Sequence, residues 1–441
     1  MFKNMIESTP KLQKNDILSA FKLFKDQKYK DLFTKIDDNY LYWDKVKYLS
    51  PNDIKPKILW SAVKIKRSMN VINLEFDKYV FHFTITGRMQ ALLHEFDMNF
   101  GGNLGAESII PDKDRKQYLV SSIMEEAIAS SQMEGASTTR KIAKEILRQQ
   151  KNPVNKSQQM IVNNYATIRY LLDHKTETMT LDYLKKIHQL ISSKTLDNPE
   201  NEGKFRNDNN IYVMDNITGE IAHTPPDASN LSELLKELCD FANDESDSPF
   251  IHPIVKGIII HFMLAFFHPF VDGNGRTSRA LVYWYLLKKG YWLTEYLSIS
   301  RIICRSKSQY EKAFLYTEND DLDLSYFINY NLVVMKKAYE ELKMYLQKKM
   351  REQKEFFTFR KITEINERQA QIIKILNERP TSIFTVKELT NRFGVTSKTA
   401  RTDLQGLVTI GLMAKSPMNK RKVGYIRSEK FDEELQKLTN E

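Results

Sequence analysis

The chain has 441 residues, of which 41% are hydrophobic and 28% are charged, with 15 Gly and 13 Pro. This composition is typical of a soluble globular protein of about three domains, and it excludes collagen-like and wholly disordered chains. The formal net charge of +10 favours acidic partners such as nucleotides or nucleic acid, and the two cysteines are too few for a disulfide framework.

No segment of the sequence is expected to direct export or to cross a membrane. The first 16 residues lack a continuous apolar stretch, so they do not resemble a signal peptide. The most apolar run, residues 257–267, is about 11 residues long, which is too short to span a bilayer and suits a buried helix. We therefore expect a cytoplasmic protein that does not associate with membranes.

Most of the chain before its last 75 residues is predicted to be helical. Residues 1–112 form an N-terminal helical region in this interpretation. Residues 113–150 are rich in helix formers, which are interrupted near Gly135. Further helices are expected at 157–173, 181–193, 228–243, 252–267, 276–289 and between 307 and 354, the last part being a charged linker helix.

One short hairpin is predicted among these helices, over residues 211–224. Two β-prone runs flank Asp215-Asn216 and Thr218-Gly219, which are turn-forming pairs. Pro225 ends the second run because proline cannot continue the hydrogen bonding of a strand.

The C-terminal region has a different pattern. Three short helices are expected at 369–376, 385–393 and 397–408, followed by two strands at 411–414 and 423–426. This order is that of a winged helix-turn-helix. Between Lys387 and Arg427, nine basic residues stand against two acidic ones, which favours contact with the phosphates of a nucleic acid.

The most informative segment is HPFVDGNGRTSR, from His268 to Arg279. The apolar helix before it is expected to end near Phe267, because Pro269 makes its continuation difficult, and a second helix should start near Arg276. The N-terminus of a helix presents unpaired backbone N–H groups, so it suits an anion. Gly273 and its neighbours allow those donors to approach phosphate closely.

The side chains of the segment add a consistent chemistry. Arg276 and Arg279 lie three residues apart, so both can face one ligand. Asp272 offers the oxygen that Mg²⁺ uses beside phosphate groups, and His268 can act as a general base near neutral pH. Together they predict a site for a di- or triphosphate, although neither a P-loop nor a dinucleotide-binding glycine pattern is present.

This segment resembles the signature of the Fic family, HPFx(D/E)GNGRxxR, at every position of the signature. Gly203-Lys204-Phe205-Arg206 and the hairpin at 211–224, in the place of the family's flap, extend the resemblance over roughly residues 80–345. The resemblance implies a mainly α fold, the Fic helical fold with a β-hairpin flap. We expect the domains 1–112, 113–345 with the Fic domain, a linker at 346–365 and a winged helix-turn-helix domain at 366–441.

The resemblance also implies an activity: transfer of AMP from ATP to a Ser, Thr or Tyr hydroxyl of a target protein. His268 would take the proton of the hydroxyl, and Asp272 would hold Mg²⁺. Arg276 would bind the β-phosphate and Arg279 the γ-phosphate. The anion hole would be formed by Gly273, Asn274 and Gly275, while Phe270 fixes the loop. The target would dock by strand addition on the flap at Ile211, Tyr212 and Val213.

A second motif lies upstream, from Ser130 to Gly135, and resembles the family's inhibitory pattern (S/T)xxxE(G/N). In such proteins the glutamate pairs with the second arginine of the signature, here Arg279. Glu134 would then prevent the γ-phosphate from binding, because a carboxylate and a phosphate compete for one guanidinium. In some relatives the same glutamate assists the removal of AMP.

Several other interpretations remain compatible with the sequence. The glycine-rich segment can be a simple connector between helices, a nucleotide site without catalysis, or part of a zinc site with His252 and His261. Glu134 can be a solvated carboxylate, and the hairpin a structural arm. The whole chain can be a nucleotide-sensing regulator that binds double-stranded DNA, or an enzyme that mainly removes AMP. The winged helix can instead serve protein interaction, and a homodimer is possible.

Overall fold

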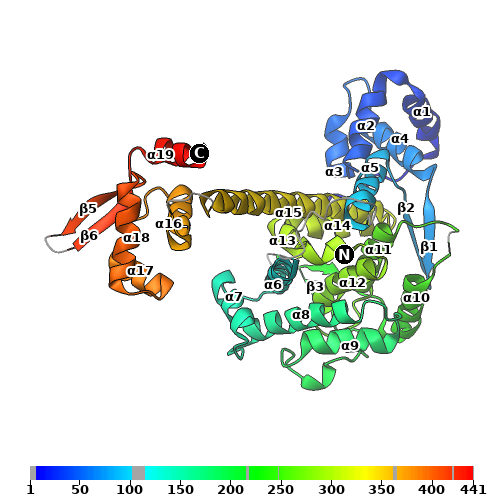
Figure 1. Ribbon diagram of the computed structural model, residues 1–441. Helices are drawn as coiled ribbons and strands as arrows, with labels where there is room; N and C mark the ends of the chain where they lie inside the picture. The colour runs from blue at the N-terminus through cyan, green and yellow to red at the C-terminus, as the bar shows by residue number, and fades with distance from the viewer. Residues whose placement is uncertain are drawn as a thin grey trace. The chain divides into compact units, whose positions relative to one another are not determined.

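The computed structural model describes residues 6–101, 115–214, 218–246, 248–360, 365–419 and 422–440. Helices dominate the described chain (Figure 1), as the sequence predicted. The chain divides into two units, Met1–Leu342 and Lys343–Glu441, each with its own core. The expected boundary at residues 112 and 113 lies outside the described residues.

The N-terminal region contains helices that were predicted and one hairpin that was not. Its elements are α1 Lys14–Lys25, η1 Gln27–Tyr29, α2 Lys30–Asp38, α3 Trp43–Val46, η2 Lys47–Leu49, α4 Pro56–Ser68, β1 Ile72–Phe76, β2 Tyr79–Phe83, α5 Gly87–Phe96 and the π-helical turn η3 Asp97–Gly101. Strands β1 and β2 pair antiparallel, and they bury Phe76, Phe81 and Phe83.

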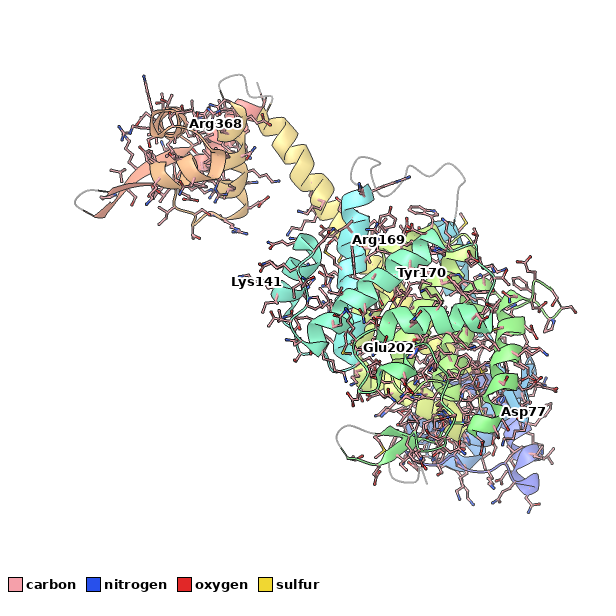
Figure 2. All side chains as sticks on the ribbon, turned by 90° about the horizontal axis from the view of Figure 1, so that it is seen from below. Asp77, Lys141, Arg169, Tyr170, Glu202 and Arg368 are labelled. Carbon is pink, nitrogen blue, oxygen red and sulfur yellow. The ribbon has the colours of Figure 1, made fainter. Side chains whose placement is uncertain are left out.

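The turn of this hairpin is fixed to a helix far along the chain. Asp77, labelled in Figure 2, donates its N–H to Glu237 Oε2 at 2.8 Å, and its carboxylate accepts from Asn230 Nδ2 at 3.2 Å. The hairpin is therefore part of the first unit's framework.

The rest of the first unit is a helical bundle with the short flap hairpin. Its elements are α6 Arg115–Met133, α7 Arg140–Gln149, α8 Lys156–Asp173, α9 Leu181–Ser192, η5 Pro199–Asn201, β3 Val213–Met214, β4 Ile221–His223, η6 Ala228–Asn230, α10 Leu231–Asn243, α11 Pro253–Phe267, α12 Asn274–Lys288, η7 Trp292–Tyr296, α13 Ile299–Arg305, α14 Lys307–Asn319 and the first part of α15 Ser325–Arg360, whose residues after Leu342 belong to the second unit. The interruption expected near Gly135 is the gap between α6 and α7.

Helices α11 and α12 form the centre of this bundle. Nearly every residue of α11 is buried, which explains why its sequence is apolar all round rather than amphipathic. Helix α12 packs on α11, α8 and α9, and α6 packs on α8 and α13. The segment between α11 and α12, which carries the signature motif, is therefore held between buried elements.

The flap hairpin consists of β3 and β4, paired antiparallel with Val213 opposite His223. Its strands are shorter than predicted because the pairing is irregular between Val213 and Met214. The turn pair Asp215-Asn216 lies outside the described residues.

The second unit is a winged helix-turn-helix with one additional helix. Its elements are α16 Glu367–Glu378, α17 Val386–Phe393, α18 Ser397–Thr409, β5 Met413–Asn419, β6 Lys422–Arg427 and α19 Phe431–Asn440. Helix α19 was not predicted. Its Phe431 is fully buried in the core of the unit. Residues 361–364 of the expected linker, and Lys420 and Arg421 between the strands, lie outside the described residues.

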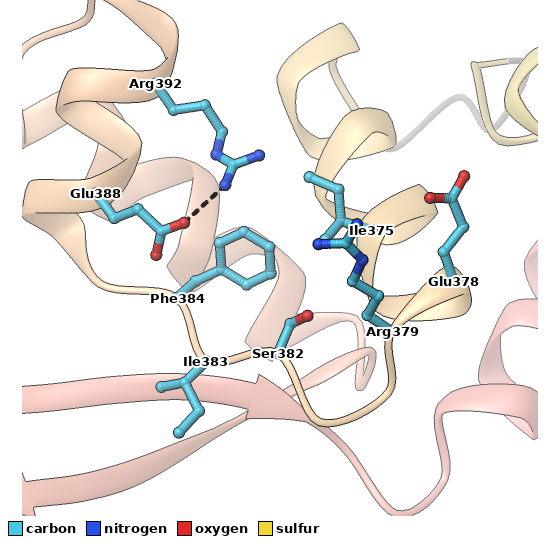
Figure 3. Close-up of a pocket in the computed structure, with 8 residues that line it drawn as sticks. All are labelled: Ile375, Glu378, Arg379, Ser382, Ile383, Phe384, Glu388 and Arg392. Atoms are coloured by element: carbon cyan, nitrogen blue, oxygen red, sulfur yellow. Dashed lines mark hydrogen bonds and ion pairs between the residues drawn. The ribbon is translucent and has the colours of Figure 1, made fainter. Parts of the chain in front are cut away.

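A cavity of about 320 Å³ opens between the end of α16 and α17 (Figure 3). Arg379 and Ser382 line it on one side, and Arg392 lines it on the other, paired with Glu388 at 2.9 Å. The cavity is lined by both positively and negatively charged side chains, and none of the signature residues lines it.

Candidate active site

The loop between α11 and α12 is held in shape by the side chain of Asn274. Its Oδ1 accepts from the N–H of Phe270 at 2.9 Å, and its Nδ2 donates to the carbonyl of Phe270 at 2.8 Å. Thr277 Oγ1 donates to the carbonyl of Gly273 at 2.9 Å. Both polar atoms of the Asn274 side chain are therefore used to hold the loop in shape.

His268 lies at the end of α11, where one of its ring nitrogens is bonded to the backbone. Its Nδ1 is 3.2 Å from the carbonyl of Ala265. Because a carbonyl only accepts, Nδ1 carries the hydrogen and the neutral ring has its lone pair on Nε2. Burial lowers the pKa of His268 to about 4, with the Ala265 carbonyl acting in the opposite direction. At neutral pH the ring can therefore accept a proton at Nε2.

Asp272 and Arg276 lie together at the start of α12. Asp272 Oδ1 accepts from the N–H of Gly273 at 2.6 Å, while its side chain is 51% exposed. The Arg276 side chain is 0% exposed, and its Nη2 is 3.7 Å from Asp272 Oδ2. Its Nη1 donates to the carbonyl of Ile191 at 3.2 Å, but Nε and Nη2 have no hydrogen-bond partner among the described residues. Such unmet donors are costly in a protein interior, and an anion would satisfy them.

Arg279 is engaged with the end of α6. Its Nε donates to Ser130 Oγ at 2.9 Å, and its Nη2 donates to the carbonyl of Ser130 at 3.0 Å and to Glu134 Oε1 at 2.8 Å. Burial acts to raise the pKa of Glu134, but the charge and hydrogen bond of Arg279 and the charge of Arg276 lower it overall. The carboxylate is therefore ionised at neutral pH.

Glu134 lies directly over the first turn of α12. A Cβ atom on Gly275 would collide with Glu134 Oε1, so the carboxylate fits there only because residue 275 is a glycine. This is the end of the helix that carries partial positive charge. From the sequence we expected that the side chains of Arg276 and Arg279 can face the same ligand. In the structure Arg276 lies beside Asp272, while Arg279 contacts Glu134.

Three buried polar residues outside the signature fix its surroundings, and sequence reasoning gave none of them a role. Arg206 Nε donates to the carbonyl of His268 at 2.9 Å. His223 Nε2 lies 2.7 Å from the carbonyl of Phe266, and His188 Nε2 lies 2.8 Å from that of Asp272. Arg206 lies within the quoted GKFR pattern, which was the one available indication.

The flap residues alternate in exposure along the chain. Tyr212 is exposed, whereas Ile211 and Val213 are half-buried. Their backbone lies on the same hairpin as His223, whose Nδ1 is 2.9 Å from Glu318 Oε2 on α14. The base of the flap is therefore tied to both α11 and α14.

The two other histidines considered for zinc have different partners. His261 is buried, with Nε2 2.8 Å from the Tyr310 hydroxyl, and His252 pairs with Asp97 at 3.0 Å. In the parts of the chain that the structure describes, no three histidine, cysteine or carboxylate side chains gather as a metal-binding cluster. The same parts contain no helix with the length and apolar character needed to cross a bilayer.

Comparisons with known proteins match a segment of each unit. Residues 178–286 match the Fic/DOC family, and residues 368–416 match the DeoR-like helix-turn-helix domain. A Fic family protein from Desulfovibrio desulfuricans G20 shares the fold, with a TM-score of 0.51 and 18% sequence identity over 78% of this chain and 97% of that one. Residues 178–286 are thus similar to the Fic/DOC family, and a winged helix-turn-helix domain follows them in the chain.

Curated relatives are similar over the Fic domain. The protein adenylyltransferase Fic of Drosophila willistoni is 33% identical over 113 residues, which are 26% of this chain and 20% of that protein. The protein of the same name from Nematostella vectensis is 30% identical over 120 residues, 27% of this chain and 26% of that protein. The chain thus spans about a fifth to a quarter of the length of these curated relatives.

Proposed function

We propose that the chain is a protein adenylyltransferase that transfers AMP from ATP to a Ser, Thr or Tyr hydroxyl of a target protein. One observation carries the proposal: the buried Arg276 guanidinium has two nitrogens without a partner among the described residues. It stands beside a half-exposed carboxylate, Asp272, in the same loop between α11 and α12 that begins at His268, whose Nδ1 is bonded to the backbone. The activity in the names of the relatives supports the same reaction.

In the proposed reaction, each of the residues described above has one role. The hydroxyl oxygen of the target bonds to the α-phosphorus while its proton passes to Nε2 of His268. The bond to the β-phosphate breaks, and pyrophosphate leaves. Arg276 binds the β-phosphate region, and the backbone of Gly273 and Gly275 lines the anion hole with the N–H of Asn274. These groups supply positioning and charge neutralisation, which are the main requirements of phosphoryl transfer.

Magnesium fits this arrangement. Among the described residues, Arg276 Nη2 at 3.7 Å is the group given beside Asp272 Oδ2, and the side chain is half exposed, so an oxygen is available as a ligand. When bound there, Mg²⁺ would neutralise part of the charge of the phosphates. The role of the chain is to hold that carboxylate in place.

We infer further that Glu134 inhibits the transfer. Its carboxylate contacts the Arg279 Nη2 that the γ-phosphate would require, at 2.8 Å. The ion pair is reinforced by both hydrogen bonds from Arg279 to Ser130. ATP would then bind productively only when Glu134 moves away.

Labelling with ATP tests the activity and its inhibition. The protein, Glu134→Gly and Glu134→Gly with His268→Ala are incubated with Mg²⁺ and ATP labelled at the α- or the γ-phosphate, with cell lysate. We expect stable α-label on protein, at least tenfold stronger in Glu134→Gly and absent from the double variant. Glu145→Gly, which removes an exposed carboxylate on α7, is the matched control and should behave as the unchanged protein.

Other outcomes favour the alternatives. Label from γ-phosphate alone would mean transfer of phosphate rather than AMP. An unchanged protein that is already as active as Glu134→Gly would exclude inhibition. Loss of an AMP-removing activity in Glu134→Gly would assign Glu134 to the reverse reaction.

A second function, binding of double-stranded DNA, is favoured by helix α18. Lys398 and Arg401 are exposed on this helix, in the domain that matches the DeoR-like family. If they contact phosphates, replacing both by alanine should reduce the salt dependence of duplex binding by up to about two units of slope. Lys437→Ala on α19 is the control, since this lysine pairs with Glu434.

The duplex experiment also tests a nucleotide-sensing regulator. Such a protein would change its duplex affinity when ATP is added, without labelling any target. No duplex binding at low salt would refute this second function and leave the C-terminal unit to protein interaction.

A further inference from the structure

His188, on α9, lies under the signature loop although it is 84 residues away in sequence from Asp272, its partner. The side chain is completely buried, at 0% exposure. Its ring stacks on that of Phe270, with centroids 3.7 Å apart and planes 4° from parallel. Such stacking fixes the plane of the imidazole, so the directions of both ring nitrogens are defined.

Both nitrogens of His188 are bonded to the backbone. The N–H of Gly203 lies 3.0 Å from Nδ1, and an N–H only donates, so Nδ1 carries the lone pair. Nε2 therefore carries the hydrogen and donates to the carbonyl of Asp272 at 2.8 Å. The backbone on the two sides thus selects a single tautomer of the neutral ring.

Gly203 can reach the ring only because it has no side chain. Its φ is +72°, and a Cβ atom would stand 3.1 Å from Gln189 Cβ and 3.1 Å from the Lys185 carbonyl. The neighbouring Glu202, labelled in Figure 2, accepts from the N–H of Lys194 at 2.7 Å and closes the loop that brings Gly203 back to α9. This geometry explains why the first residue of the GKFR segment is a glycine.

The bond from His188 acts on the peptide group that orients the Asp272 carboxylate. The accepted carbonyl and the N–H of Gly273 belong to the same planar peptide unit and point in opposite directions. That N–H donates to Asp272 Oδ1 at 2.6 Å. Gly273, with φ +85°, has the conformational freedom that would let this peptide rotate. Rotation would turn the N–H away from the carboxylate.

We propose that His188 is a positioning residue for the magnesium nucleotide: by holding the Asp272 carbonyl, it keeps the Asp272–Gly273 peptide in the one orientation that presents the Asp272 carboxylate to a metal. The proposal rests on the proposed function, in which Asp272 binds Mg²⁺. His188 contacts neither nucleotide nor metal, and its effect is transmitted entirely through this peptide group.

The test measures binding rather than turnover. The parent is the full chain with Glu134→Gly and His268→Ala, which should bind ATP without reacting. Calorimetry gives its affinity for ATP with and without Mg²⁺. His188→Phe keeps the stacking on Phe270 but removes both hydrogen bonds. His188→Gln keeps an acceptor and a donor.

We expect His188→Phe to weaken binding of Mg²⁺ with ATP at least tenfold and to leave binding of ATP alone within about twofold, since only the metal ligand is disturbed. His188→Gln should recover most of the loss. The matched control is His174→Phe, because His174 also stacks on a ring, that of Tyr170 (Figure 2), with centroids 3.9 Å apart, and its Nδ1 lies 2.8 Å from the carbonyl of Tyr170.

Three results would overturn the proposal. The first is that His188→Phe binds Mg²⁺ with ATP as tightly as the parent. The second is that His188→Gln binds Mg²⁺ with ATP as weakly as His188→Phe. The third is that His188→Phe loses as much affinity for ATP without Mg²⁺ as with it. If His188→Phe does not fold, as judged by circular dichroism, His188→Met replaces it in the same comparison. A parent that binds no ATP at all would instead refute the proposed function on which the inference depends.

Discussion

At the residue scale, the charge state of His268 has a measurable consequence. Burial lowers its pKa to about 4, so the ring is already neutral and able to accept a proton throughout the range from pH 5.5 to 8 of a typical assay. A histidine in water would be half protonated near pH 6.5.

We therefore predict that kcat/KM of Glu134→Gly is flat from about pH 8 to 5.5 and falls only as the pH approaches the lowered pKa, since this ratio reports the free enzyme. The base is lost on protonation, so the fall must be on the acid side. Glu134 itself acts to raise the pKa of His268, so its removal does not shift the fall to higher pH. An acid limb near pH 6.5 would contradict the assignment.

Gly275 permits a second prediction. A Cβ atom there would displace Glu134, but it would also stand 3.1 Å from Arg279 Nη1, where the γ-phosphate is expected. Gly275→Ala should therefore stay at or below the activity of the unchanged protein in the α-label assay, in contrast to Glu134→Gly. A strong gain of label would mean that relief of inhibition needs only the departure of the carboxylate.

The sequence predicted the groups of the signature because they lie within twelve consecutive residues. It could not predict His188 or the anchoring role of Arg206. Each bonds a backbone carbonyl of a segment more than sixty residues away, and backbone acceptors leave no mark on residue type. The unmet donors of Arg276 were equally hidden, since they depend on the burial of the whole side chain.

At the element scale, the flap can be tested through its backbone. Met214 in strand β3 and Tyr212 just before the strand are exposed, and docking by strand addition needs the peptide N–H groups of this edge. Val213→Pro removes one N–H. We expect KM for the target to rise several-fold in the Glu134→Gly background while KM for ATP stays unchanged. Equal changes in both would indicate that the substitution disturbs the nucleotide site instead.

The predicted helices were confirmed where their period was clear or where a proline or glycine marked an end, as at Pro253 for α11 and Gly394 after α17. The hairpin β1–β2 was missed. Its strands alternate over only five residues each, within a stretch of mixed aromatics and lysines, and their stability depends on burying Phe81 and Phe83 against the first unit. Helix α19 similarly depends on the burial of Phe431.

Helix α18 is tied to α16 through a buried carboxylate. Asp403 accepts from Asn366 Nδ2 at 2.7 Å and from Arg368 Nε at 2.7 Å. Arg368 is labelled in Figure 2. Because charged hydrogen bonds of this kind contribute more than neutral ones, Asp403→Ala should destabilise the second unit by about 2 kcal/mol.

At the scale of the whole molecule, the two units have separate cores, so we predict that they unfold separately. All four tryptophans lie in the first unit. Fluorescence therefore reports that unit alone, whereas far-ultraviolet circular dichroism reports both. Asp403→Ala should lower one thermal transition by roughly 10 °C in circular dichroism and leave the fluorescence transition unchanged.

The control for this experiment is Asp432→Ala, which removes an exposed partner of Arg427 and should shift neither transition by more than about 2 °C. A common shift of both signals would show that the units unfold as one cooperative body. The order of short helices and strands predicted a separate C-terminal domain, but the exact division could not be predicted, because α15 continues as one helix through residues 342 and 343.

The backbone of His268 has a consequence for how such a protein can evolve. The residue closes α11 in the left-handed conformation, with φ +47°, where glycine is preferred and other residues are disfavoured by about 1 kcal/mol or more. Drift toward a more stable fold would therefore tend to replace this histidine, and only selection for the reaction would retain it. A lineage that no longer needed the chemistry should lose the imidazole early while keeping the fold.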